Sequence, residues 1–178
     1  MPNWCENSLQ VTGPERVLAA WVTCVKSNLG SEIGLLETFC APAYNEDKSN
    51  WWEAQTTAWS TKWDVPINEL DITEHNGVVS MTFATAWSPP LGWMNTMSRD
   101  WPSLTFNLAF EEGGMCFMGY IIMRDGDSYE AEDEMIDYKF ADDPIEQSRI
   151  EEAWHDAMSV RRDKLMFEAS DAYERAMY

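Results

Sequence analysis

Apolar and polar residues alternate along much of the first two thirds of the chain, and this pattern predicts strands. In residues 2–12, Leu9 and Val11 alternate with polar neighbours, which is typical of a strand with one buried face. The same alternation predicts strands over 65–74, 78–87 and 104–110, and a mostly apolar run predicts a further strand over 115–124. An Asn-Gly pair at 76–77 separates two of these strands, and it favours a tight hairpin turn.

Two segments repeat their apolar residues every three or four positions, which predicts amphipathic helices. The first covers 14–28, with an apolar stripe of Val17, Leu18, Trp21, Cys24 and Val25. The second covers 89–100, with Leu91, Met94 and Met97 on one face. Ser88 is expected to cap this second helix and Pro89 to occupy its first turn.

The resulting order is strand, helix, strand, strand, helix, strand, with one further strand. This order predicts an α+β fold with a ferredoxin-like (split βαβ) antiparallel sheet and helices on one face. We expect this domain over residues 1–124, an acidic connector over 125–143, and a C-terminal helix or helical hairpin over 144–178. Asp143 and Pro144 form a helix start signal, and no Gly or Pro follows them.

Residues 29–64 show no regular pattern and are predicted to form a long loop, rich in tryptophan. The chain has ten tryptophans, and four of them fall at positions 51, 52, 59 and 63. Two interpretations stay open. The indoles could pack as a lid over one sheet edge, since large aromatics dominate core burial. Alternatively, Trp52, Trp59 and Trp63 could form an aromatic binding surface.

Charge narrows the choice of partner. The chain carries 31 acidic and 12 basic residues, a net charge of −19, so we expect it to be repelled by nucleic-acid backbones and anionic membranes. Residues 111–143 are the most acidic stretch. We predict a partner-binding surface for a basic protein or nucleoprotein complex there, made of Glu111, Glu112, Asp125, Asp127, Glu130, Glu132, Asp133, Glu134, Asp137, Asp142 and Asp143.

Catalytic and metal-binding patterns are weak in this sequence. The four cysteines are scattered, without CxxC spacing, and His75 and His155 lie far apart. Residues 125–130 begin like a calcium loop but place Glu130 where the loop needs glycine. We therefore expect no metal, no cofactor, no catalytic residues and no enzymatic activity. The absence of a signal peptide or a long apolar run predicts a cytoplasmic protein.

Four motifs form a recognisable set: Met1 to Leu9, Trp59 to Asp64, Phe83 to Pro90, and the combination of Pro102, Leu104 and Phe106 with Glu111, Gly113 and Phe117 to Gly119. Together they resemble the YubB ferredoxin-like domain family, found on phages and bacterial plasmids. The resemblance covers about residues 1–124 and implies a ferredoxin-like fold. No catalytic residues can be carried over from the family, because it is largely of unknown function. Ser60 stands where the family pattern has glycine.

These observations favour an acidic, phage- or plasmid-encoded interaction protein. The leading hypothesis is an inhibitor of a host nucleic-acid-binding defence complex, such as a CRISPR-Cas or restriction system, acting by DNA mimicry. Carboxylates would then pair with the partner's Lys and Arg. One alternative is a ligand-binding protein or enzyme that uses the tryptophan-rich segment 51–63. Another is an assembly protein that self-associates through 144–178.

Overall fold

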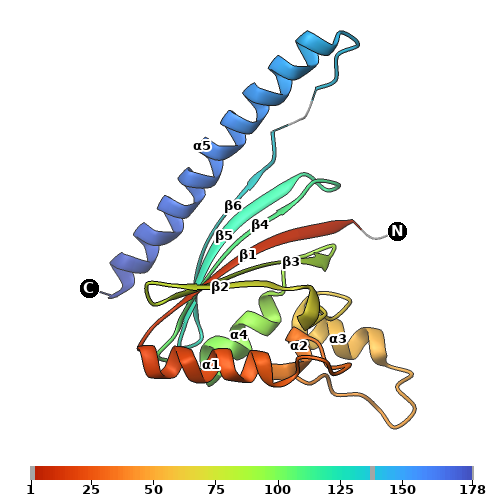
Figure 1. The fold of residues 1–178 in the computed structure, drawn as a ribbon, viewed down its shortest axis with the longest axis vertical. Coiled ribbons are helices and arrows are strands. Elements are labelled where there is room, and N and C mark those ends of the chain that lie inside the picture. The colour runs from red at the N-terminus through yellow and green to blue at the C-terminus, as the bar shows by residue number, and fades with distance from the viewer. Residues whose placement is uncertain (1–2, 137–138, 178) are drawn as a thin grey trace.

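A computed structural model describes residues 3–136 and 139–177 of the chain (Figure 1). Its helices and strands, in chain order, are β1 (Trp4–Thr12), α1 (Glu15–Ser27), α2 (Leu35–Phe39), α3 (Trp51–Trp59), the 3-10 turn η1 (Ile67–Glu69), β2 (Asp71–His75), β3 (Val78–Ala86), α4 (Leu91–Asp100), β4 (Thr105–Glu112), β5 (Phe117–Arg124), β6 (Asp127–Glu134) and α5 (Pro144–Met177).

The strands form one antiparallel sheet in the order β2-β3-β1-β4-β5-β6. Strands β1 and β2 both run antiparallel to β3, which lies between them, and α1 to α3 connect them. Helix α4 then joins β3 to β4, which pairs with the other side of β1. This is the split βαβ arrangement, so the predicted ferredoxin-like fold is confirmed. Strands β5 and β6 extend the sheet beyond β4.

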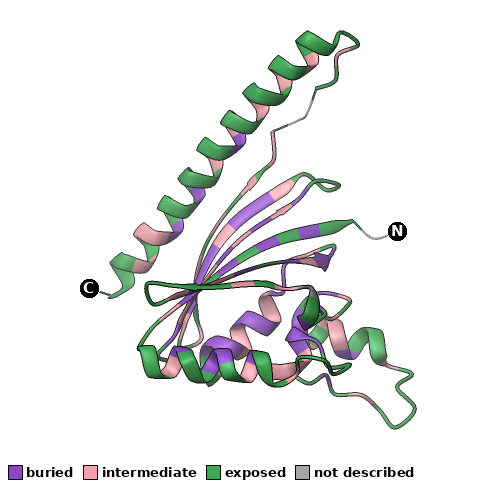
Figure 2. Cartoon of the chain, viewed as in Figure 1, coloured by how far each residue is buried: buried purple, intermediate pink, exposed green. Residues whose placement is uncertain are grey.

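The main core lies between one face of the sheet and helices α1, α2 and α4. Alternate residues of β1, from Cys5 to Val11, point into it, as the alternation in sequence predicts. Trp21 of α1 and Trp93 of α4 are fully buried there, and Phe39 of α2 contacts both rings. Figure 2 shows these buried positions along the strands and on the inner sides of the helices.

Helix α5 packs on the opposite face of the sheet, over β5 and β6 (Figure 1). Met158 and Leu165 form a second, smaller core with Met118 of β5. The start of α5 extends beyond the sheet (Figure 1), and Val160 and Phe167 are exposed on the helix. Self-association through 144–178 stays a prediction. None of the helices in the described residues combines the length and apolar content needed to cross a bilayer.

Four predictions about elements are wrong. Residues 65–70 are not strand, because the 3-10 turn η1 lies there and β2 begins only at Asp71. Residues 29–64 are not only loop, because they contain α2 and α3. The segment 125–143 is not only a connector, because β6 lies within it and pairs with β5 along its whole length. Helix α4 begins at Leu91 without a side-chain cap at its N-cap residue. The Ser88 hydroxyl instead donates to the Ser60 carbonyl at 2.5 Å.

The predicted start of the C-terminal helix is confirmed. The Asp143 carboxylate accepts the backbone N–H groups of Ile145 at 3.0 Å and Glu146 at 2.9 Å. These N–H groups have no partner inside the helix, so the carboxylate satisfies them and also complements the positive end of the helix dipole. Residues 144–177 form one continuous helix in place of a hairpin.

Candidate functional site

The acidic residues predicted to bind a partner do not lie on one surface. Glu112 is 1% exposed, and its carboxylate accepts the N–H groups of Gly114 at 2.7 Å and Met115 at 2.6 Å. It therefore holds the turn between β4 and β5. The prediction that Glu112 belongs to a partner-binding surface is wrong, because alternation at the end of β4 turns its side chain into the core.

Two further predicted acids connect α5 to the sheet. Glu111 of β4 pairs with Arg162 at 2.6 Å, and Asp133 of β6 lies 3.5 Å from Arg161 and 3.9 Å from Lys164. All three basic residues belong to α5. Glu111 and Asp133 are thus partly neutralised within the chain, and each makes a weaker docking group for a basic partner than an unpaired carboxylate.

Glu130, Glu132 and Glu134 form an exposed row on β6, here called the acidic row. Their side chains point to the face opposite α5, because the alternate residues Tyr129 and Asp133 contact that helix. No ion pair within the described residues involves the acidic row. Since β6 is the outermost strand, the row is open to an incoming partner.

The other predicted acids lie at the ends of this region. Asp125, with a φ of 51°, and Asp127 flank the turn between β5 and β6, and both are exposed. Asp142 is exposed beside the capping residue Asp143. Asp137 lies outside the described residues.

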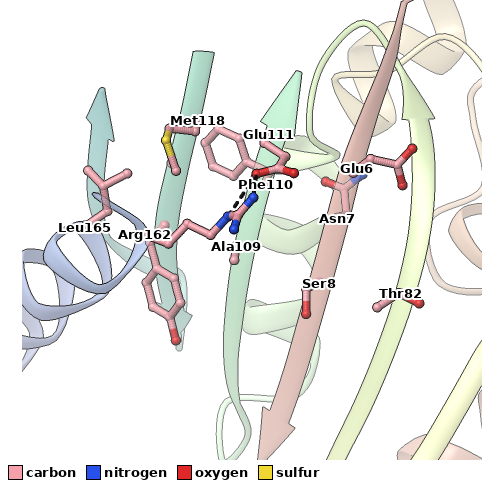
Figure 3. A pocket seen from close by; sticks show the side chains of 12 residues that line it. Glu6, Asn7, Ser8, Thr82, Ala109, Phe110, Glu111, Met118, Arg162 and Leu165 are labelled. Carbon is pink, nitrogen blue, oxygen red and sulfur yellow. Dashed lines mark hydrogen bonds and ion pairs between the residues drawn. The ribbon is translucent and has the colours of Figure 1, made fainter. Parts of the chain in front are cut away.

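A groove of about 340 Å³ separates α5 from the uncovered part of its sheet face. Figure 3 shows small side chains, Ser8, Thr82 and Ala109, on the strands that line it, with the Arg162–Glu111 pair at the α5 side. The groove exists because α5 covers only β5 and β6.

The tryptophan-rich segment divides between core and surface. Trp59 is 1% exposed, and its indole N–H donates to the Cys40 carbonyl at 2.7 Å. Its predicted place in an aromatic surface is therefore wrong. Trp52 and Trp63 are exposed, as such a surface requires, with 52% and 36% of their area accessible.

Three exposed indoles surround one ammonium group. The Lys62 Nζ atom lies 4.7 Å from the ring centroid of Trp63, 5.3 Å from that of Trp87 and 5.7 Å from that of Trp51. Trp4 adds a fourth ring, 5.9 Å from Trp63. Trp4, Trp51, Trp63 and Trp87, with Lys62, are here called the tryptophan cluster. Such cation–π distances are within the attractive range of about 6 Å.

Trp87 is held in a strained conformation within this cluster. Its φ is 70°, in the left-handed region that a bulky residue rarely adopts. Hydrogen bonds fix it: its N–H donates to the Asn3 carbonyl at 2.9 Å, and the Ala86 carbonyl accepts the Thr61 hydroxyl at 2.9 Å. Such strain costs about 1–3 kcal/mol and tends to accompany functional sites. Here it presents a half-exposed indole to solvent.

A pocket of about 490 Å³ adjoins the cluster and is here called the Trp4 pocket. Its lining residues are Trp4, Glu6, Trp63, Asp64, Val65, Pro66, Phe83 and Ala84. Asp64 fixes the loop that carries Trp63. Its carboxylate accepts the N–H groups of Leu36 at 2.7 Å, Val65 at 2.7 Å and Glu37 at 3.1 Å. Burial raises the pKa of Asp64, and these hydrogen bonds oppose the rise.

Sequence reasoning missed Trp4, Trp51, Trp87 and Lys62 as one site. They come from the start of β1, from α3 and its following loop, and from the end of β3. Only the sheet register, which pairs Trp4 with Ala86, brings these ends together. The remaining candidates for chemistry, His75 and His155, are both exposed, at the β2–β3 hairpin and on α5.

The fold and these surfaces define a ferredoxin-like domain with an extended sheet and a C-terminal helix. Residues 62–157 match the family described as the ferredoxin-like domain in Api92-like protein, and the chain belongs to this family. A crystal structure of protein Api92 from Yersinia pseudotuberculosis is similar, with a TM-score of 0.53 and 10% sequence identity, covering 79% of this chain and 100% of that one.

At this identity the likeness concerns the fold alone. No match was found among curated proteins. The resemblance to the YubB family therefore stays a prediction, whereas the ferredoxin-like domain is confirmed.

Proposed function

We propose that this chain is an acidic interaction protein that binds a basic partner, and that the acidic row is its main electrostatic docking surface. The observation that carries the proposal is the contrast between the two faces of β6. Asp133, toward α5, is paired with basic side chains. Glu130, Glu132 and Glu134, on the other face, are exposed.

The position of the row on an edge strand supports this role. Carboxylates two residues apart on a strand repeat at about 6.6 Å, which equals the spacing of alternate side chains in an extended basic segment. The Glu134 N–H bonds the Asp133 carboxylate at 2.9 Å, and the Met135 N–H bonds the Cys116 carbonyl at 2.8 Å. The N–H of Met135 thus faces β5, and the N–H of Glu134 does not. Because successive residues of a strand point their N–H and C=O groups to opposite sides, the backbone groups of Glu130 and Glu132 point away from β5.

DNA mimicry is the more demanding form of this proposal. Phosphates along one DNA strand repeat every 3.4 Å or so along the helix axis, about half the spacing of the acidic row. A mimic would need further carboxylates, of which Asp125 and Asp127 are exposed at the end of the same strand. A host nucleic-acid-binding protein or defence complex, encountered by a phage- or plasmid-encoded chain, is the partner class that we propose.

The test is affinity capture with the full chain from a nuclease-treated bacterial lysate. We expect capture of a basic nucleic-acid-binding protein, weakened by salt because surface charge pairs are screened. The triple variant E130Q/E132Q/E134Q should bind that protein about tenfold less tightly. The control E32Q/E46Q/E152Q removes the same charge from exposed residues elsewhere and should retain binding. Equal loss in both variants, or no basic protein captured, would contradict the proposal.

A further inference from the structure

The Trp4 pocket has the chemistry of a site for a cationic side chain. We propose that it binds the guanidinium group of an arginine carried by the partner. This inference rests on the proposed function, because it names the group by which a basic partner would be anchored. It concerns a different part of the molecule from the acidic row, which lies on β6 at the far side of the sheet from β3.

The aromatic walls supply the first contact. Trp4 and Trp63 line the pocket, and the Trp63 ring already holds a cation, because the Lys62 ammonium lies 4.7 Å from its centroid. Arginine stacks on indole faces through its planar, weakly hydrated guanidinium group. Tryptophan and arginine are also enriched among the residues that dominate binding energy at interfaces.

Glu6 supplies the opposite charge. It lines the same pocket, is exposed, and takes part in no ion pair within the described residues. Asp64 lines the pocket too, but its carboxylate is occupied by backbone N–H groups. Glu6 is therefore the carboxylate suited to a two-point pair with a guanidinium group.

Lys62 decides between a cationic and an anionic ligand. It is the only lysine or arginine between Lys48 and Arg99, and it approaches three indoles of the cluster. An arginine entering beside Trp63 would be repelled by this ammonium group and would compete with it for the ring. A negatively charged ligand would instead be attracted by Lys62. Removing the lysine charge must therefore change the affinity in opposite directions for the two ligand classes.

The strain at Trp87 supports a binding role for the cluster. The left-handed φ of Trp87 occurs at a residue whose side chain is half-exposed. This conformation places the Trp87 ring centroid 5.3 Å from the Lys62 Nζ atom. Trp87 therefore provides a second ring for the lysine when an arginine replaces the lysine over Trp63.

The first experiment uses the full chain and the peptide acetyl-Gly-Arg-Gly-amide. Nuclear magnetic resonance of the indole N–H groups, assigned with single Trp→Phe variants, reports the contacts. We expect saturable shifts at Trp4 and Trp63. A peptide with citrulline, the neutral isostere of arginine, should produce none. Equal shifts with citrulline, or no shifts with arginine, would overturn the proposal.

Three variants test the assigned roles with the same peptide. Glu6→Gln should weaken binding about tenfold, through loss of a charge-assisted pair. Lys62→Met should tighten it about fivefold, through loss of a nearby like charge. Trp52→Ala removes an exposed indole that lies outside the pocket and should leave the affinity unchanged. Thermal unfolding midpoints confirm that each variant is folded.

An unchanged affinity in Glu6→Gln, or an unchanged or weakened one in Lys62→Met, would exclude an arginine site. The variant E130Q/E132Q/E134Q separates this inference from the proposed function, since it should bind the peptide as the original chain does. If the chain binds the peptide but captures no basic partner, only the proposed function is contradicted. If capture of the partner depends on the acidic row but the chain does not bind the peptide, only the proposed arginine site is contradicted.

Discussion

At the scale of single residues, a buried thiol near the start of β1 shows how the sheet controls the ionisation of a side chain. Cys5 is fully buried and lies opposite Glu112 in the β1–β4 register. Burial, and then the negative charge of Glu112, raises the pKa of the Cys5 thiol to about 12. The folded protein thus holds this thiol neutral at pH values where the unfolded chain ionises it.

This difference predicts a loss of stability at alkaline pH. The unfolded thiol releases its proton near pH 9.0 and the folded one near pH 12, so the unfolded state binds fewer protons between these values. The free energy of unfolding should therefore fall by up to about 1.4 kcal/mol per pH unit in this window. The test is urea unfolding at pH 8, 9.5 and 10.5. The free energy of unfolding should fall less steeply with pH in Cys5→Ala than in the original chain, once the pH-independent loss of packing in this variant has been subtracted.

Cys116→Ala is the matched control for this prediction, because Cys116 is exposed on the β4–β5 turn. It should reproduce the pH dependence of the original chain. If Cys5→Ala and the original chain lost stability in parallel, the thiol would not be the group responsible.

Composition does not predict whether an individual tryptophan is buried or exposed. Trp21, Trp59 and Trp93 are buried, whereas Trp51 and Trp87 are exposed, and the neighbouring residues do not distinguish the two groups. Ser60 is more informative. Its φ of 64° lies in the left-handed region, which glycine adopts without steric cost, and this fits the glycine that the resemblance predicts at this position.

At the scale of elements, the sequence predicts the strands and helices whose two faces differ in polarity. Strands β1, β3 and β4 have one buried face and were predicted from alternation. Strand β6 was missed because acidic residues occupy both of its faces, with Asp133 turned toward the basic residues of α5. Helix α3 was missed because only Ala54 and Trp59 are buried along it, too few to form an apolar stripe.

The first turn of α5 tests how an element depends on its cap. Only Met158, Leu165 and Ala169 of this helix are buried, so its first turns, before Met158, gain little from packing. Asp143→Ala should cost about 1 kcal/mol locally, with about fivefold faster hydrogen exchange in residues 145–150 and little change in global unfolding. Asp142→Ala, at the adjacent exposed position, should have no such effect. Equal exchange in both variants would show that the cap contributes nothing.

At the scale of the whole molecule, the net charge of −19 sets two salt effects against each other. Self-repulsion destabilises the compact state, and salt screens it. The ion pairs that hold α5, such as Glu111–Arg162, weaken with salt, but exposed pairs contribute only about 0.2–1 kcal/mol each. We expect repulsion to dominate, because acidic residues outnumber basic ones by more than two to one.

Raising NaCl from about 20 to 200 mM shortens the screening distance from roughly 20 Å to below 10 Å. Relief of about 1 kcal/mol of repulsion should raise the thermal midpoint of the full chain by about 2–4 °C. Capture of a basic partner should weaken over the same range, so salt stabilises the fold while it loosens the complex. A midpoint that falls instead would mean that the pairs between α5 and the sheet outweigh the repulsion, and E111Q would then lower the midpoint at low salt and remove this salt dependence.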